Sequence, residues 1–189
     1  MHRFSKILIL SILAVFAASC SKQNLKTAWS TQESQIDSFI ESLSTEGDPD
    51  NPDALYAHDV IYNGGSSRVI LREGTGDGLV EGGTVSFYYT GYVFEGSISA
   101  SSIFATNDQQ TATENSWEVT DASYEVKTVR LSADDGLVTG LHNGLEGVRT
   151  GEICYILFSG QYGFGKRTVG IIPGNSAILY QIRVESVSN

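Results

Sequence analysis

The stretch GLVTGLHNGLEGVRTGEICYILFSGQYGFG, residues Gly136–Gly165, contains the local patterns that decide the fold. Its apolar residues Leu141, Leu145 and Val148 recur at spacings of four and three. Because an α-helix has 3.6 residues per turn, this spacing places the three side chains on one face. The pattern therefore predicts one short amphipathic helix over about 141–148.

The rest of the same stretch predicts a strand and a loop. Arg149-Thr150-Gly151 supplies a basic residue and then glycine, a combination that commonly ends helices. The run Ile153–Phe158 is continuously apolar and has the length of a buried strand. Tyr162-Gly163-Phe164-Gly165 then forms an aromatic loop punctuated by glycine.

The segments on the amino-terminal side add further strands. Residues Val60–Tyr62, Arg68–Leu71 and Thr84–Tyr89 are rich in residues that favour strands. Asn63-Gly64 predicts a hairpin between the first two segments, and Gly65-Ser66-Ser67 suggests that its loop is longer than two residues. With 189 residues and 20 glycines, the chain is expected to form one mainly β domain with appendages.

The charge balance argues against nucleic acid as a partner. The formal net charge is −10, from 12 basic and 22 acidic residues. Removing Arg3 and Lys6 with a leader would leave 10 bases against 22 acids, or −12. A protein that binds the phosphate backbone needs clustered Lys and Arg, which this chain lacks.

The amino terminus resembles the leader of a bacterial lipoprotein. A basic start is followed by the apolar segment Ile7–Phe16, which is too short to span a bilayer stably. Small residues at 17–19 then precede Cys20, as in a lipobox. Cys20 is thus predicted to carry lipid after removal of residues 1–19, and Ser21 favours the outer membrane, facing the periplasm. The alternative is an ordinary signal peptide in which the cysteine is incidental.

Few other residues suggest reactive chemistry. Once Cys20 is assigned to lipid, Cys154 has no partner for a disulfide, and its apolar surroundings indicate a core residue. His58 and His142 are isolated and show no metal-ligand spacing. The acidic segment 48–53 is interrupted by proline and is interpreted as a solvated linker, not a calcium loop.

Residues 20–58 are predicted to form a tether followed by an amphipathic helix. Ser30 and Glu33 match a capping box, which places the start of the helix at Ser30. Ile36, Phe39, Ile40 and Leu43 then form a helical apolar stripe of about three turns. This helix is expected to pack on its own domain, with a dimerisation helix as the alternative.

Five motifs resemble those of the FKBP-type peptidyl-prolyl isomerases, in family order and spacing. They are Tyr89-Thr90-Gly91-Tyr92-Val93-Phe94-Glu95-Gly96, Leu137-Val138-Thr139-Gly140-Leu141, Gly144-Leu145-Glu146-Gly147-Val148 with Gly151-Glu152, Tyr162-Gly163-Phe164-Gly165, and Ile171–Tyr180. The resemblance covers roughly Val69 to Val187. It implies an α+β fold, a twisted antiparallel sheet wrapped around one short helix, over residues 59–189.

The resemblance also implies which residues form the site. The catalytic pocket would be lined by Tyr89, Phe104, Val138, Leu141, Phe164, Ile172 and Tyr180, with Leu137, Ile171 and Ala105 contacting substrate. Val138 would contribute its backbone N–H. No metal or cofactor is implied, and the partners would be proline-containing unfolded or extended polypeptides.

Three positions depart from the family pattern. Leu141 stands where the family has a tryptophan floor, Phe164 where it has a tyrosine hydroxyl, and Ala105 where it has a carboxylate. Each lost neutral hydrogen bond weakens binding by about 0.5–1.5 kcal/mol. The sequence therefore predicts a weakly active isomerase that assists folding of exported proteins at the cell envelope, with poor macrolide binding. The alternative is a non-catalytic FKBP-like binding or chaperone module.

Overall fold

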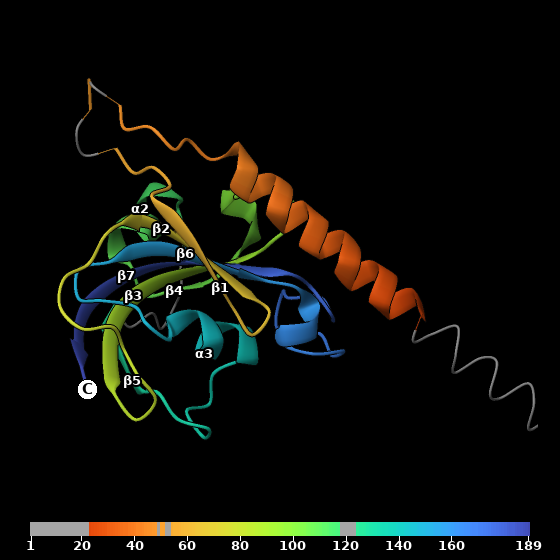
Figure 1. The fold of residues 1–189 in the computed structure, drawn as a ribbon. Helices are drawn as coiled ribbons and strands as arrows, with labels where there is room; N and C mark the ends of the chain where they lie inside the picture. Colours follow the sequence, from red (N-terminus) through yellow and green to blue (C-terminus); the bar gives the residue numbers. More distant parts are fainter. Residues whose placement is uncertain (1–22, 49, 52–53, 118–123) are drawn as a thin grey trace, which may run out of the picture.

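The chain folds into one antiparallel sheet with a helix on each face (Figure 1). The computed structural model describes residues 23–48, 50–51, 54–117 and 124–189. The strands run in the order β1-β2-β6-β7-β3-β4, and β5 pairs with β3 beside β4. Their bounds are β1 Asp59–Asn63, β2 Ser66–Arg72, β3 Thr84–Val93, β4 Ile103–Thr106, β5 Lys127–Arg130, β6 Ile153–Phe158 and β7 Ile178–Ser188. This architecture confirms the predicted α+β fold.

The apolar run of β6 is explained by cover on both faces of the sheet. Cys154, Ile156 and Phe158 belong to the core beneath α3 (Thr139–Leu145), whereas Ile153 and Leu157 belong to the core on the opposite face. Successive side chains of a strand point to opposite faces, so a strand covered on both sides must be apolar throughout.

Helix α3 confirms the predicted short helix, although its bounds differ from 141–148. It ends at Leu145 because Glu146 adopts an extended conformation and Gly147 has a φ of +81°. The Val148 N–H then bonds to the Leu145 carbonyl in a turn, which still buries Val148 completely.

The amino-terminal helix covers residues 23–42 and is longer than predicted. Ser30 therefore lies inside it, and the predicted start at a Ser30–Glu33 capping box is wrong, as is a tether over 23–28. Leu25 and Trp29 are partly buried at helical spacing before Ile36, so the stripe facing the domain begins about three turns earlier than Ile36 suggested.

This helix packs on its own domain, as expected. Ile36 is buried in the second core, with Phe39 and Ile40 packed against it. The Gln32 amide donates to the Asn175 carbonyl at 2.8 Å, and its oxygen accepts from the Gly160 N–H at 2.8 Å. The helix thereby holds both ends of the loop between β6 and β7.

The first hairpin is tighter than the sequence suggested. Asn63 pairs with Ser66, so only Gly64 and Gly65 form the loop, and Ser66 and Ser67 already belong to β2. Both glycines have positive φ, +53° and +86°, which a primed hairpin turn requires and which side-chain-bearing residues rarely adopt.

The predicted leader and the lipidation site Cys20 lie outside the described residues. Within those residues, no helix is both long and apolar enough to cross a membrane.

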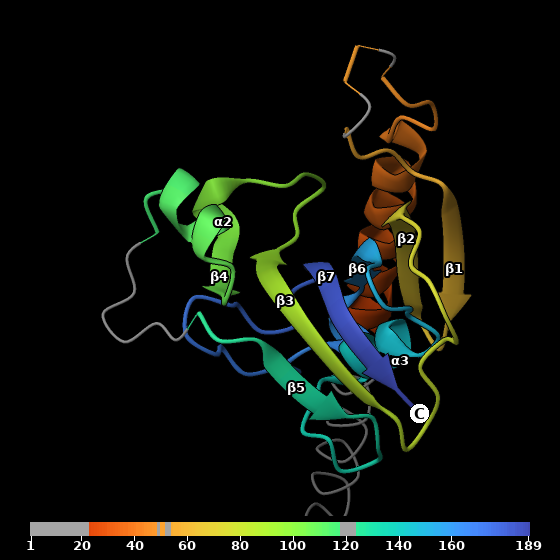
Figure 2. The same cartoon turned by 90° about the vertical axis from the view of Figure 1, so that its left-hand side faces the viewer.

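The segment 97–117 lies at the edge of the sheet next to β3 and contains β4 and a short helix. Figure 2 shows β4 and α2 (Gln109–Glu114) on the far side of β3 from the β1–β2 hairpin. Asp108 caps α2 by accepting from the Thr111 N–H at 2.9 Å, and it pairs with Arg183 of β7 at 3.2 Å. Segment 97–117 is thus tied to the central sheet.

Candidate active site

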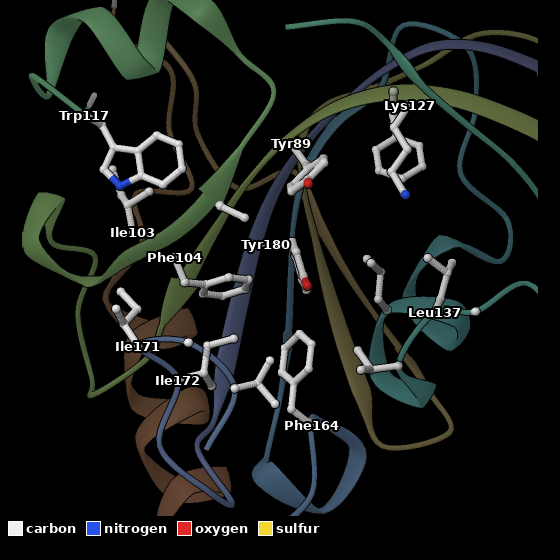
Figure 3. Close-up of a pocket in the computed structure, with 17 residues that line it drawn as sticks. Tyr89, Ile103, Phe104, Trp117, Lys127, Leu137, Phe164, Ile171, Ile172 and Tyr180 are labelled. Atoms are coloured by element: carbon white, nitrogen blue, oxygen red, sulfur yellow. The ribbon is translucent and has the colours of Figure 1, made fainter. Parts of the chain in front are cut away.

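A cavity of about 560 Å³ lies between β3, β4, β5, β7 and the start of α3 (Figure 3). This volume is within the range of pockets that bind small molecules or single side chains. Leu141 forms the base from α3 and is 5% exposed, while Ile172 and Tyr180 contribute buried walls. The cavity is therefore an apolar space that opens at the surface.

Aromatic rings form most of one wall through edge-to-face contacts. The Phe104 ring meets Phe164 at 5.8 Å and Tyr180 at 5.7 Å between centroids, both at 83°. Tyr180 also meets Tyr89 at 5.9 Å. Such contacts stabilise each pair by about 0.5–1.5 kcal/mol beyond their buried area, so the wall is rigid before a ligand arrives.

The structure brings together every residue that the resemblance assigned to the site. All of them line this cavity, namely Tyr89, Phe104, Ala105, Leu137, Val138, Leu141, Phe164, Ile171, Ile172 and Tyr180. Ile171 is 61% exposed and stands at the mouth. The Val138 N–H has no acceptor among the described residues and precedes the first turn of α3.

The cavity also includes residues that sequence reasoning missed. Trp117 follows α2 and reaches the wall beside Ile103, and Lys127 enters from β5 (Figure 3). Neither lies in a motif, and the register between 97 and 137 could not be set from sequence. Strand alternation in β5 could have indicated Lys127, because Lys127 and Val129 lie two residues apart and therefore on the same face of the strand.

Two hydroxyl groups face the cavity despite the loss of one at Phe164. In Figure 3 the phenolic oxygens of Tyr89 and Tyr180 both point into the open space. Burial raises the pKa of Tyr89 and of Tyr180 above the ordinary value for tyrosine. Both phenols therefore stay protonated at neutral pH and can donate a hydrogen bond.

Asn107 fixes the strands that carry the pocket. Its side-chain oxygen accepts from the Tyr89 N–H at 2.6 Å, while its amide donates to the Glu125 carbonyl at 2.9 Å and the Phe87 carbonyl at 3.3 Å. The residue is buried, so these bonds are made where water cannot replace them. Asn107 thus joins β3 to the segment entering β5.

Asp135 fixes the lip of the cavity. Its carboxylate accepts from the Leu137 N–H at 2.8 Å and lies 2.6 Å from Nδ1 of His142. Although burial acts to raise the pKa of Asp135, the hydrogen bonds from Leu137 and His142 lower it overall. His142 does not line the cavity and is a partly exposed residue of α3.

Cys154 is a core residue, as the sequence indicated. Its thiol is buried under α3, and burial raises its pKa well above the ordinary value for cysteine. A protonated, inaccessible thiol is a poor nucleophile, so it takes no part in chemistry at the cavity.

The curled antiparallel sheet, the short helix α3 and the aromatic cavity between them define an FKBP-like domain. The family described as FKBP-type peptidyl-prolyl cis-trans isomerase matches residues 76–185. That match spans more than half of the chain, so the chain belongs to the FKBP-type peptidyl-prolyl cis-trans isomerase family.

Two mammalian relatives carry names that bear on activity. The chain is 27% identical over 150 residues to the human protein named inactive peptidyl-prolyl cis-trans isomerase FKBP6, covering 74% of this chain and 39% of that protein. The mouse protein of the same name is 28% identical over 131 residues, covering 67% of this chain and 33% of its own length. The chain thus spans less than half of either relative.

Solved bacterial structures share the fold. FkpA from Escherichia coli superposes with a TM-score of 0.55 at 18% identity, covering 95% of this chain and 71% of that one. A peptidyl-prolyl cis-trans isomerase from Pseudomonas syringae superposes with a TM-score of 0.54 at 17% identity, covering 87% and 96%. At these identities the likeness concerns the fold alone.

Proposed function

We propose that this protein is a peptidyl-prolyl cis-trans isomerase of reduced activity that acts on proline-containing segments of exported proteins. The observation that carries the proposal is the preformed aromatic cavity, in which the residues matching the family motifs meet. By the lipobox, the protein would be anchored through lipid on Cys20 at the outer membrane, facing the periplasm. Its substrates would be unfolded or extended chains, and it would use no cofactor.

The reaction requires no nucleophile, because only a rotation is catalysed. Amide resonance sets a barrier of about 18–20 kcal/mol to rotation about the peptide bond. In the twisted transition state the carbonyl is less polar than in the planar amide, so it loses less by leaving water. A dry apolar cavity therefore favours the transition state over the ground state, which is differential binding.

Different residues of the cavity would bind the proline ring and orient the peptide. Phe104, Leu141 and Phe164 would hold the proline ring by apolar contact. The Val138 N–H would orient the flanking carbonyl, since it has no acceptor within the described residues. Tyr180 would supply a hydroxyl donor from the wall opposite α3, which offsets the hydroxyl missing at Phe164.

Catalysed exchange in proline tetrapeptides tests the function directly. We expect measurable acceleration by the purified protein, and a loss of at least about tenfold in Tyr89→Ala, because that change opens the aromatic wall. Exchange spectroscopy by NMR, with circular dichroism to confirm folding, gives both quantities. A folded protein that leaves the uncatalysed rate unchanged would contradict catalysis.

A conservative variant separates the Tyr180 hydroxyl from the Tyr180 ring. Tyr180→Phe keeps the contacts with Phe104 and Tyr89 but removes one donor, which is worth about 0.5–1.5 kcal/mol. We expect kcat/KM to fall roughly two- to tenfold while the free energy of unfolding changes little. Equal kcat/KM in both proteins would show that the hydroxyl contributes nothing to the transition state.

A binding module is the second candidate, favoured by specific residues. Among the described residues that line the cavity, Leu141 stands in place of an aromatic floor and Ala105 in place of a carboxylate. Two relatives are also named inactive. In that case the same cavity would hold proline segments of clients without accelerating their rotation. Peptide binding in the absence of catalysed exchange would distinguish this candidate.

A further inference from the structure

Lys127 is placed by strand pairing where an apolar residue is expected. β5 pairs with β3 so that Lys127 lies opposite Phe87 and Val129 opposite Val85. Side chains two apart on a strand share a face, so Lys127 follows the same side as Val129, which is buried in the main core. The strand therefore directs a cation toward the cavity.

Within the described residues, Lys127 has no ion-pair partner. Among the described residues that line the cavity, Lys127 is the only one with a charged side chain. In Figure 3 its amine points down, on the side of the cavity where Leu137 lies. An ammonium group at the edge of an apolar pocket is poised to pair with a carboxylate supplied by a ligand.

We propose that Lys127 makes this cavity selective for proline segments with an acidic residue directly beside the proline. The inference rests on the proposed function, because it assumes that the cavity receives the proline ring. Lys127 then acts as a specificity-determining residue, because it contacts the side chain beside the proline and not the peptide bond that rotates.

The net charge of the protein acts against the preference that we propose. At a formal net charge of −10, long-range repulsion disfavours acidic peptides. A preference for them must therefore come from a local cation. It should also weaken as salt screens the pair, because the Lys127 side chain is exposed.

The test compares peptides that differ only beside the proline. One set varies the residue before the proline and the other the residue after it, each with Glu, Gln or Lys. Both kcat/KM and the dissociation constant are measured by NMR on the purified protein at low and high salt. For an exposed pair we expect Glu to be favoured over Gln roughly two- to fivefold in at least one set.

Three variants assign any preference to its source. Lys127→Met should bring the ratio between Glu and Gln peptides to one or below, whereas Lys127→Arg should keep the preference. Lys166→Met removes the same charge from an exposed residue that does not line the cavity, so the ratio should stay at its original value.

The outcomes separate this inference from the proposed function. Equal values for Glu and Gln in both sets, or a preference that survives in Lys127→Met, would overturn the role of Lys127 while leaving catalysis intact. If no peptide is isomerised, catalysis fails, and the dissociation constants of the same peptides decide whether the charge preference exists. If no peptide binds, both proposals fail.

Discussion

Replacing Arg68 with methionine is expected to lower the free energy of unfolding by about 3–5 kcal/mol. Arg68 is 4% exposed and Glu152 2% exposed, and Nε of the arginine lies 3.4 Å from Oε1 of the glutamate. The guanidinium also donates to the Gly144 carbonyl at 3.1 Å and to the Glu146 carbonyl at 2.6 Å, at the end of α3. The change therefore leaves one buried charge and two carbonyls without their partner.

The pKa of Glu152 indicates how the penalty depends on pH. Burial raises this pKa above the ordinary value even though Arg68 acts to lower it. Without the arginine, the folded state binds a proton still more readily than the unfolded state. The destabilisation should therefore shrink as the pH falls through the folded-state pKa of Glu152.

Urea denaturation of single and double variants measures the effect. In the original chain the Arg149 N–H donates to the Glu152 carboxylate at 3.2 Å. The double variant Arg68→Met/Glu152→Gln removes the unpaired buried charge and keeps an acceptor for this N–H. We expect the double variant to be more stable than Arg68→Met, although less stable than the original chain. A double variant no more stable than Arg68→Met would show that the ion pair is not the source of the loss.

Replacing Gly140 with alanine is expected to lower the free energy of unfolding by about 3 kcal/mol and to remove most of the isomerase activity proposed for this chain. A Cβ at this position would lie 2.1 Å from the Phe158 ring, which is itself 1% exposed. Alanine favours a helix by about 1 kcal/mol over glycine, but overpacking a rigid core costs more. Helix α3 must move away from the sheet, and it would carry Leu141, the base of the cavity, with it.

A neighbour on the same helix and a compensating change provide the controls. Thr139→Ala alters an exposed residue, so its effect should stay within about 0.5 kcal/mol. Gly140→Ala/Phe158→Leu makes room for the methyl group, so its loss should be smaller than the sum of the two single losses. Losses in unfolding experiments that add within about 0.5 kcal/mol would contradict a direct clash.

Much of this protein was determined by its sequence alone. The spacing of Leu141, Leu145 and Val148 predicted α3, and the apolar run Ile153–Phe158 predicted the strand β6. The residues that the resemblance assigned to the site all line one cavity. Local patterns succeed there because they are set by near neighbours, through helical period, strand alternation and glycine turns.

Other features were decided only when distant segments met. Lys127 enters the cavity because β5 pairs with β3, and no local pattern encodes that register. Trp117 reaches the same cavity from the end of α2. Arg68 meets Glu152 because β2 pairs with β6. Gly140 has no room for a methyl group because the Phe158 ring of β6 lies against the helix at that point. The charge in the pocket, the buried ion pair and the packing of Gly140 against Phe158 all depend on residues far apart in sequence, which only the packed sheet brings together.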